Sequence, residues 1–305
     1  MPVRMGEARQ ADFFPPLQHA LNSSCSCIPL TLATIDSTPW KWCIGRRHDV
    51  AMKVSVLFTP ADFSALATQP LHDAVCVVFD ILRATTSIVT ALHAGAEAIV
   101  PVDGIAEALA LREKDESILL AGERNGLRID RSLTGSIDFN LGNSPREFTA
   151  ESVRGRKLAV TTTNGTRALR ACRHASTVIA SSFLNLSSTA RFVSQLPATR
   201  VLLICSGTHE FAAYEDTLAA GAMSALLRRD YEASDQDDSA PMARMLFEAV
   251  SSQLADALAQ SQNGARLLTI PELAADVPFC AQLDSKPCIV TGDREGWLRA
   301  AAAAG

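Results

Sequence analysis

The chain has 305 residues, of which 48% are hydrophobic and 20% are charged, so it can bury the core of one large or two medium domains. Its formal net charge of −5, with basic residues scattered along the sequence, argues against nucleic-acid binding, which needs a basic face. The eight cysteines form no Cys-x-x-Cys pair and no apolar run reaches the ~20 residues of a membrane span, so we expect a cytoplasmic protein with free thiols and no membrane partner.

Residues 1–51 differ in composition from the rest of the chain. They contain paired prolines and many turn-forming residues, show little periodicity, and lack the charged start and continuous apolar centre of a signal peptide. We expect them to form a poorly ordered N-terminal extension. Met52, followed by "KVSVLF", resembles a natural start of the folded domain.

From Met52 onward, short apolar runs alternate with helical patterns. The apolar runs predict strands at 54–58, 74–80, 97–102, 117–122, 157–162, 176–181, 200–206 and 287–292. The helical patterns cover about 84–94, 104–114, 164–173, 185–195, 213–230, 241–260 and 294–303. Strands that are apolar throughout are covered on both faces. The alternation predicts an α/β fold of βαβ units, layered α/β/α around a mostly parallel or mixed sheet. It spans 52–305, either whole or in two halves of about 52–150 and 155–305.

A long connection, from Glu123 to about Arg154, separates the two sets of strands. It is rich in glycine and asparagine, and its sequence predicts no regular element. Connections of this length inside a compact domain are usually functional.

Three loops place small polar residues directly after predicted strands. They begin with "DILRATTS" at Asp80, "TTTNGT" at Thr161 and "CSGT" at Cys205, and the third is followed by the acidic pair Glu215-Asp216 at a helix start. Ligands of open α/β sheets bind beyond the carboxyl ends of strands. Such residues are also the ordinary N-caps of helices, so any one loop alone has a purely structural explanation.

The combination of these loops favours a phosphate bound with a metal ion. Free backbone N–H groups at helix starts favour anions, and Mg²⁺ takes one or two carboxylates together with water and phosphate oxygens. Familiar phosphate motifs are absent from the sequence. The dipeptide Gly-Lys of a Walker A loop never occurs, and Leu82 stands where a haloacid-dehalogenase motif needs a second aspartate after Asp80.

Six sequence blocks, in order and at matching spacing, carry a resemblance to a known family. They are "VVFDILRATTSIVTAL", "GERNG", "FNLGNSP", "TTTNGTRAL", "CSGT" and "YEDTLAAGA". Between about Met52 and Gly292 the chain resembles the 2-phosphosulfolactate phosphatase family. The resemblance implies a Mg²⁺-dependent phosphoric monoester hydrolase that converts (2R)-2-phospho-3-sulfolactate and water to 3-sulfolactate and phosphate, a reaction of coenzyme M biosynthesis.

On this interpretation we expect the following roles. The metal ligands are Asp80, Glu123, Glu215 and Asp216. The catalytic residues are Asp80, Arg83, Glu123, Arg124 and Asp216, where Asp80 is either a metal ligand or a covalent nucleophile. The substrate-binding residues are Thr85, Thr86, Asn143, Ser144, Thr162, Thr163, Asn164, Gly165, Thr166, Ser206 and Gly207.

Two alternatives remain open at the level of the sequence. One is a phosphatase of the same fold that acts on another small phosphorylated hydroxy acid. The other is a non-catalytic protein that binds an anionic metabolite, although a pure anion binder gains nothing from neighbouring carboxylates. The expected partner is in each case a small phosphate- or sulfonate-bearing molecule, and homodimerisation is left open.

Overall fold

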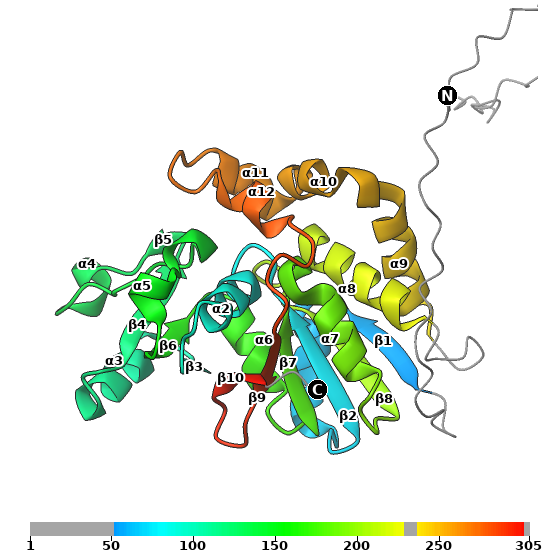
Figure 1. Ribbon diagram of the computed structural model, residues 1–305, viewed down its shortest axis with the longest axis horizontal. Helices are drawn as coiled ribbons and strands as arrows, with labels where there is room; N and C mark the ends of the chain where they lie inside the picture. The colour runs from blue at the N-terminus through cyan, green and yellow to red at the C-terminus, as the bar shows by residue number, and fades with distance from the viewer. Residues whose placement is uncertain (1–51, 229–236, 302–305) are drawn as a thin grey trace, which may run out of the picture. The chain divides into compact units, whose positions relative to one another are not determined.

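A single mixed sheet organises the computed structural model, which describes residues 52–228 and 237–301 (Figure 1). Its strands are β1 (Lys53–Leu57), β2 (Ala74–Phe79), β3 (Ala98–Pro101), β4 (Leu119–Arg124), β5 (Leu127–Arg128), β6 (Lys157–Thr161), β7 (Thr177–Ser181), β8 (Arg200–Cys205), β9 (Ile289–Gly292) and β10 (Leu298–Ala301). Their order across the 10-stranded sheet is β1-β8-β2-β7-β9-β10-β3-β6-β4-β5. All eight predicted strands are present, whereas the extension expected at 1–51 lies outside the described residues.

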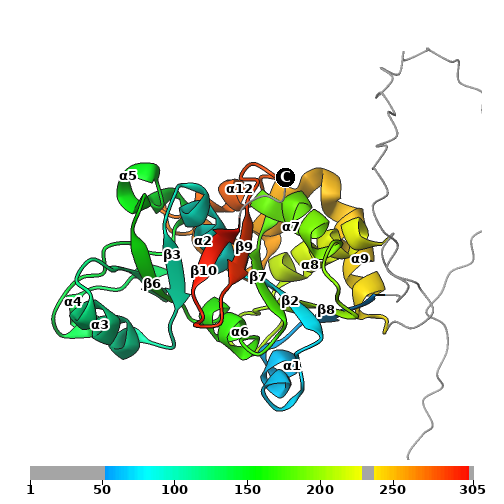
Figure 2. The ribbon, with the colours of Figure 1, turned by 60° about the horizontal axis from the view of Figure 1, so that its bottom comes forward.

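The sheet consists of two parallel sets joined by a hairpin. Strands β1, β8, β2 and β7 run parallel to one another, and so do β3, β6 and β4. The antiparallel hairpin β9–β10 lies between the sets and bridges to β7 and β3 (Figure 2). Each set combines strands from before and after residues 150–155. The mixed sheet that the sequence predicted is therefore confirmed.

Helices cover both faces of the first parallel set. On one face the hydrophobic core joins the sheet to α7 (Leu186–Val193), α8 (Tyr214–Leu227) and α9 (Ser239–Val250), and on the other to α2 (Ala84–His93) and α6 (Gly165–Ala171). Strand β2 supplies Val77 to the first core and Val78 to the second, as expected for a strand buried on both faces. A third core packs α3 (Ile105–Lys114) on the second set. This arrangement confirms the layered α/β/α fold.

The predicted helices that follow residue 230 differ from the structure. The helix expected at 241–260 is divided into α9 and α10 (Leu254–Gln260), and then α11 (Gln262–Leu268) and α12 (Asp276–Cys280) follow. Figure 1 shows α10–α12 gathered at one end of the first set.

The prediction of a helix at 294–303 is wrong, because Leu298–Ala301 form strand β10. The turn explains the difference. Asp293 accepts hydrogen bonds from the N–H groups of Glu295 and Trp297, and Gly296 has a φ of 87°. The chain therefore reverses and pairs with β9, and tertiary pairing overrides the helix propensity of the alanines.

The long connection after residue 123 contains regular elements that the sequence did not predict. Strands β4 and β5 form a hairpin whose two loop residues, Asn125 and Gly126, both have positive φ, at 55° and 82°. This is the backbone of a type I′ turn, which favours Asn-Gly. Short helices α4 (Arg131–Thr134) and α5 (Ala150–Val153) follow.

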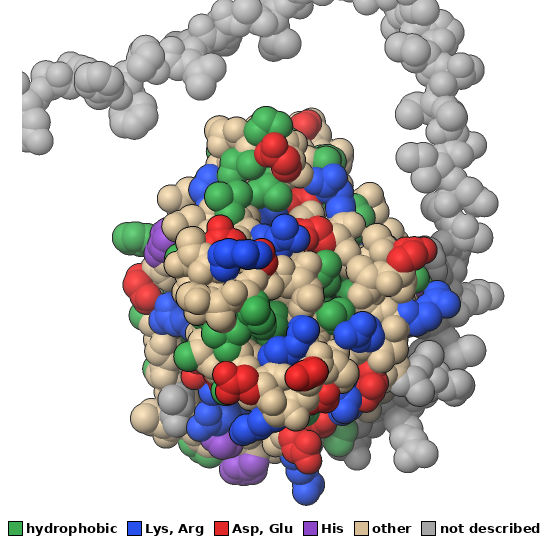
Figure 3. Space-filling view, turned by 90° about the vertical axis from the view of Figure 1, so that its left-hand side faces the viewer, with side chains coloured by type: hydrophobic (Ala, Val, Ile, Leu, Met, Phe, Trp, Pro, Cys, Tyr) green, Lys and Arg blue, Asp and Glu red, His purple; other side chains and the backbone are tan. Residues whose placement is uncertain are grey.

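Basic and acidic side chains are interspersed across the face of the molecule that Figure 3 shows. Among the described helices, none has the length and apolar character that a membrane span needs. The cysteines of the described residues are free thiols.

We predict that Gly221→Ala destabilises the protein although alanine is the better helix former. A Cβ at Gly221 in α8 would stand 2.1 Å from the carbonyl oxygen of Ala243 in α9, so the two helices must separate. Overpacking of this kind costs about 1–3 kcal/mol, against a gain of ~1 kcal/mol in helix propensity. The free energy of unfolding in urea measures the result. The control is Gly292→Ala, where the added Cβ meets Val178 at an ordinary 3.5 Å. Equal stability of both variants contradicts the prediction.

Candidate active site

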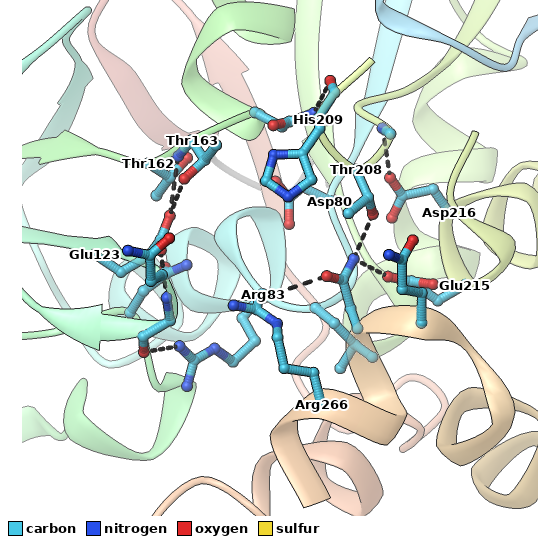
Figure 4. A pocket seen from close by; sticks show the side chains of 18 residues that line it. Asp80, Arg83, Glu123, Thr162, Thr163, Thr208, His209, Glu215, Asp216 and Arg266 are labelled. Carbon is cyan, nitrogen blue, oxygen red and sulfur yellow. Dashed lines mark hydrogen bonds between the residues drawn. The ribbon is translucent and has the colours of Figure 1, made fainter. Parts of the chain in front are cut away.

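A cavity of about 500 Å³ opens where the loops after β2, β4, β6 and β8 meet helix α11. Figure 4 shows Glu123 beside Thr162 and Thr163 on one side, Glu215 and Asp216 on the other, and Asp80 between them. The residues that line it are Asp80, Leu82, Arg83, Glu123, Asn125, Gly126, Asn143, Thr162, Thr163, Asn164, Gly207, Thr208, His209, Glu215, Asp216, Gln262, Asn263 and Arg266. Three loops that are far apart in the sequence therefore form one wall.

Asp80 is fixed by the turn that starts α2. Its Oδ1 accepts a hydrogen bond from the N–H of Ala84 at 2.9 Å, and the hydroxyl of Thr85 donates to its backbone carbonyl at 3.0 Å. Its Oδ2 faces the second loop, where a Cβ on Gly165 would stand only 2.5 Å away. Glycine at 165 thus lets the second loop close over the Asp80 carboxylate.

Arg83 is buried and held by two other segments. Its Nη1 lies 2.5 Å from the carboxylate of Asp276 in α12, and its Nη2 donates to the carbonyl of Gly126 at 2.7 Å. Asp276 is also fully buried and accepts from Ser144 and Arg146 at 2.7 and 2.8 Å. Arg83 therefore lines the cavity in a fixed position, and it shares the single carboxylate of Asp276 with Arg146.

Glu123 joins the β4–β5 hairpin to the second loop. One carboxylate oxygen accepts from the N–H and the hydroxyl of Thr163, both at 2.9 Å, and the other accepts from the N–H of Gly126 at 2.7 Å. Both oxygens thus already have protein donors, and the contacts fix the relative position of two cavity walls.

Asp216 joins the first and third loops from the first turn of α8. Its two oxygens accept from the N–H groups of Ile81 at 2.8 Å and Gly207 at 3.1 Å. Its neighbour Glu215 accepts from the side-chain amide of Asn263 in α11 at 2.7 Å. Both carboxylates are almost fully buried, with 1% and 2% of Glu215 and Asp216 exposed.

Burial and the neighbouring acids raise the pKa values of Asp80 and Asp216. Burial, with the like charges of Glu123 and Glu215, raises the pKa of Asp80 to about 7, although the N–H of Ala84 and the charge of Arg83 lower it. Burial and the charges of Glu215 and Asp80 raise the pKa of Asp216 well above its usual range. A bound cation would relieve this repulsion.

The donor set fits Mg²⁺ held by few protein ligands. Within residues 52–228 and 237–301 no three His, Cys, Asp or Glu side chains form a complete metal cage. Mg²⁺ normally keeps several waters and takes only one or two carboxylates, with phosphate oxygens in the remaining positions. Asp80 with Glu215 or Asp216 supplies hard oxygen ligands of that kind.

Asn164 connects the second loop to the third. Its side-chain amide donates to the carbonyls of Ser206 at 3.1 Å and His209 at 2.9 Å. Gly207 has a φ of 74°, and a Cβ there would stand 2.4 Å from the carbonyl of Phe211. The tight turn of the third loop therefore requires glycine and brings Thr208 and His209 to the cavity.

The structure separates the expected site residues into two groups. Those that line the cavity are Asp80, Arg83, Glu123, Asn143, Thr162, Thr163, Asn164, Gly207, Glu215 and Asp216. The others are not among the lining residues, namely Thr85, Thr86, Arg124, Ser144, Gly165, Thr166 and Ser206. The hydroxyls of Thr86 and Thr166, for example, donate to backbone carbonyls five and four residues earlier. Arg124 donates to the carbonyl of Glu123 and to Thr161.

Sequence reasoning missed two prominent cavity residues, Asn263 and Arg266, as well as Asp276 beside Arg83, and it named Thr208 only as part of the third loop. Ser261 caps α11, but this signal lies beyond the single helix expected at 241–260. One acceptor in the wall also lacks a partner in the described part of the chain: Oδ1 of Asn143 is buried and accepts no hydrogen bond. Buried polar atoms are normally paired, so a ligand or its water shell is expected to supply a donor here.

Comparison with known proteins agrees with this site. A family model described as 2-phosphosulpholactate phosphatase matches residues 63–294. A relative from Thermotoga maritima is 37% identical over 227 residues, which are 73% of this chain and 92% of the relative. One from Carboxydothermus hydrogenoformans is 38% identical over 251 residues, or 81% of this chain and 96% of the relative. Both relatives are named probable 2-phosphosulfolactate phosphatase.

The matched range contains the three strand-end loops, the β4–β5 hairpin and α11, and hence every residue that lines the cavity. The resemblance to this family is thus confirmed. With this match over most of its length, the chain belongs to the 2-phosphosulfolactate phosphatase family, a family of phosphoric monoester hydrolases.

Proposed function

We propose that this protein hydrolyses (2R)-2-phospho-3-sulfolactate to 3-sulfolactate and phosphate, with Mg²⁺ as its cofactor, as a step of coenzyme M biosynthesis. Family membership supports the reaction class, and the names of the relatives support the substrate. One structural observation carries the proposal. The buried carboxylates of Glu215 and Asp216 and the partly buried carboxylate of Asp80 share a small polar cavity with hydroxyl and guanidinium donors.

The acids at one end of the cavity would hold the metal. Asp80 with Glu215 or Asp216 would bind Mg²⁺, since the carboxylate of Glu123 accepts three hydrogen bonds, that of Asp216 two, and those of Asp80 and Glu215 one each. When bound, Mg²⁺ would neutralise phosphate oxygens and orient the attacking group for in-line displacement. Whether Asp80 serves as a ligand or as the nucleophile, its role requires a charged oxygen.

Two hydroxyls of the cavity can donate to phosphate oxygens. The Thr162 oxygen accepts from the N–H of Thr166 at 3.3 Å, and the Thr208 oxygen accepts from Asn263 at 2.6 Å. Because each oxygen already accepts a protein donor, its own proton can be directed at a ligand. Arg83, fixed by Asp276, adds positive charge without needing to reorganise during the reaction.

We predict that phosphate release from phosphosulfolactate requires Mg²⁺ and depends on the nature of the ester. Chelation with EDTA should abolish release and added Mg²⁺ should restore it, because the buried carboxylates alone repel an anionic phosphate. A panel of phosphosulfolactate, phospholactate and phosphomalate should show the highest kcat/KM for the sulfonate. Full turnover in EDTA argues against the metal. If kcat/KM is highest for phosphomalate, the proposed substrate is wrong, whereas the proposed reaction, hydrolysis of a phosphate monoester, still holds.

We predict that Asp80→Asn lowers kcat by at least ~100-fold, the scale at which a group that stabilises transition-state charge acts. The variant should fold, because the asparagine oxygen can still accept from the N–H of Ala84 and one buried negative charge is removed. Its melting temperature should equal or exceed that of the wild type. Asp138→Asn is the control, since Asp138 pairs with Arg131 on the surface. Wild-type turnover by Asp80→Asn removes Asp80 from the mechanism.

A further inference from the structure

Helix α11 brings Arg266 to the cavity. This arginine has no acidic partner among the described residues. The Arg266 side chain lines the cavity and remains exposed there, with its guanidinium directed inward from α11 (Figure 4). Its hydrogen bond to Oδ1 of Asn263 is long, at 3.5 Å. Across the described ranges 52–228 and 237–301, no Asp or Glu side chain forms an ion pair with it. Arg266 is therefore available to an anion from solution.

Two guanidinium groups meet at the tip of the β4–β5 hairpin. Arg83 donates to the carbonyl of Gly126 at 2.7 Å, and a Cβ on Gly126 would stand 3.4 Å from Nη1 of Arg266. Arg83 shares the carboxylate of Asp276 with Arg146, and Arg266 has no ion pair within residues 52–228 and 237–301. Neighbouring like charges favour a bound anion between or beside them.

Asn263 keeps Arg266 apart from the acids across the cavity. Its amide nitrogen donates to Glu215 at 2.7 Å, while its amide oxygen accepts from Arg266. The uncharged side chain thus stands where a direct Glu215–Arg266 ion pair would otherwise satisfy both charges. Glu215 is left for a cation, and Arg266 is left for an acidic group of the ligand.

We propose that Arg266 binds one of the two acidic groups of the substrate that are not hydrolysed, the sulfonate or the carboxylate, while the phosphate lies toward Asp80. This inference rests on the proposed function, and it assigns recognition of the end of the substrate that is not hydrolysed to helix α11. A guanidinium presents paired N–H donors in the plane that such oxygens match, so the contact selects as well as attracts. Arg266 is then a specificity residue, separate from the hydrolytic groups.

Steady-state kinetics with two esters tests the inference. The variants are Arg266→Gln, Arg266→Lys and the control Arg173→Gln, at an exposed position in the turn after α6. The substrates are phosphosulfolactate and ethyl phosphate with Mg²⁺. For phosphosulfolactate, Arg266→Gln should raise KM by roughly 10–100-fold, the range for charged hydrogen bonds, while kcat changes less than ~3-fold. The KM of Arg266→Lys for phosphosulfolactate should lie between those of the wild type and Arg266→Gln. For ethyl phosphate, which has no second acid, kcat/KM should stay within ~2-fold.

Calorimetric titration with 3-sulfolactate provides a second measurement that needs no turnover, and its Kd should rise by a similar factor in Arg266→Gln. The inference is overturned if Arg266→Gln lowers kcat/KM equally for both esters. It is also overturned if kcat/KM for both esters and the Kd for 3-sulfolactate are unchanged. If the wild type cleaves neither ester but Arg266→Gln weakens 3-sulfolactate binding, the proposed hydrolysis fails while the acid-binding role stands. If the wild type neither cleaves nor binds, both fail.

Discussion

The arrangement of the site depends on neighbouring carboxylates that form no ion pair with a basic side chain of the described residues. In the described ranges, Asp80, Glu215 and Asp216 are held by backbone N–H groups or by the amide of Asn263, and none pairs with a basic side chain. Burying like charges is costly, and the raised pKa of Asp80, about 7, reflects that cost. Most of the stabilising energy must come from the surrounding α/β core. A divalent cation with a phosphate is the ligand pair whose binding would relieve the repulsion.

The same carboxylates also organise the loops. Asp216 accepts from the first and third loops, and Glu123 joins the hairpin to the second loop. Gly165 lets the second loop close over Asp80, and Asn164 fastens it to the third. Glu215 and Arg266 do not pair with each other, because the side chain of Asn263 stands between them. This separation provides a place for a metal-bound phosphate and another for a second acid.

The sequence predicts much of the fold and the polar wall because those signals are local. Apolar runs mark the buried strands, and hydroxyls with glycine after a strand mark the three loops. Prediction from the sequence fails where a residue's role depends on contacts with residues far away in the chain. Thr85 and Thr86 resemble ligand-binding residues, but their hydroxyls bond to the backbone of the first loop. Asp276 and Arg266 lie on short helices whose position is set by tertiary packing, so no spacing rule links them to Arg83 or Gly126. The alanine-rich segment at 294–303 has the composition of a helix, and only its pairing with β9, which is not visible in the sequence, makes Leu298–Ala301 a strand.

A crystal structure grown with Mg²⁺ and 3-sulfolactate tests the central claim most directly. The account predicts a cation in contact with Asp80 and with at least one of Glu215 and Asp216, and the sulfonate or carboxylate of the product at Arg266. A cation bound elsewhere, with these acids paired only to one another and to the protein backbone, would contradict it.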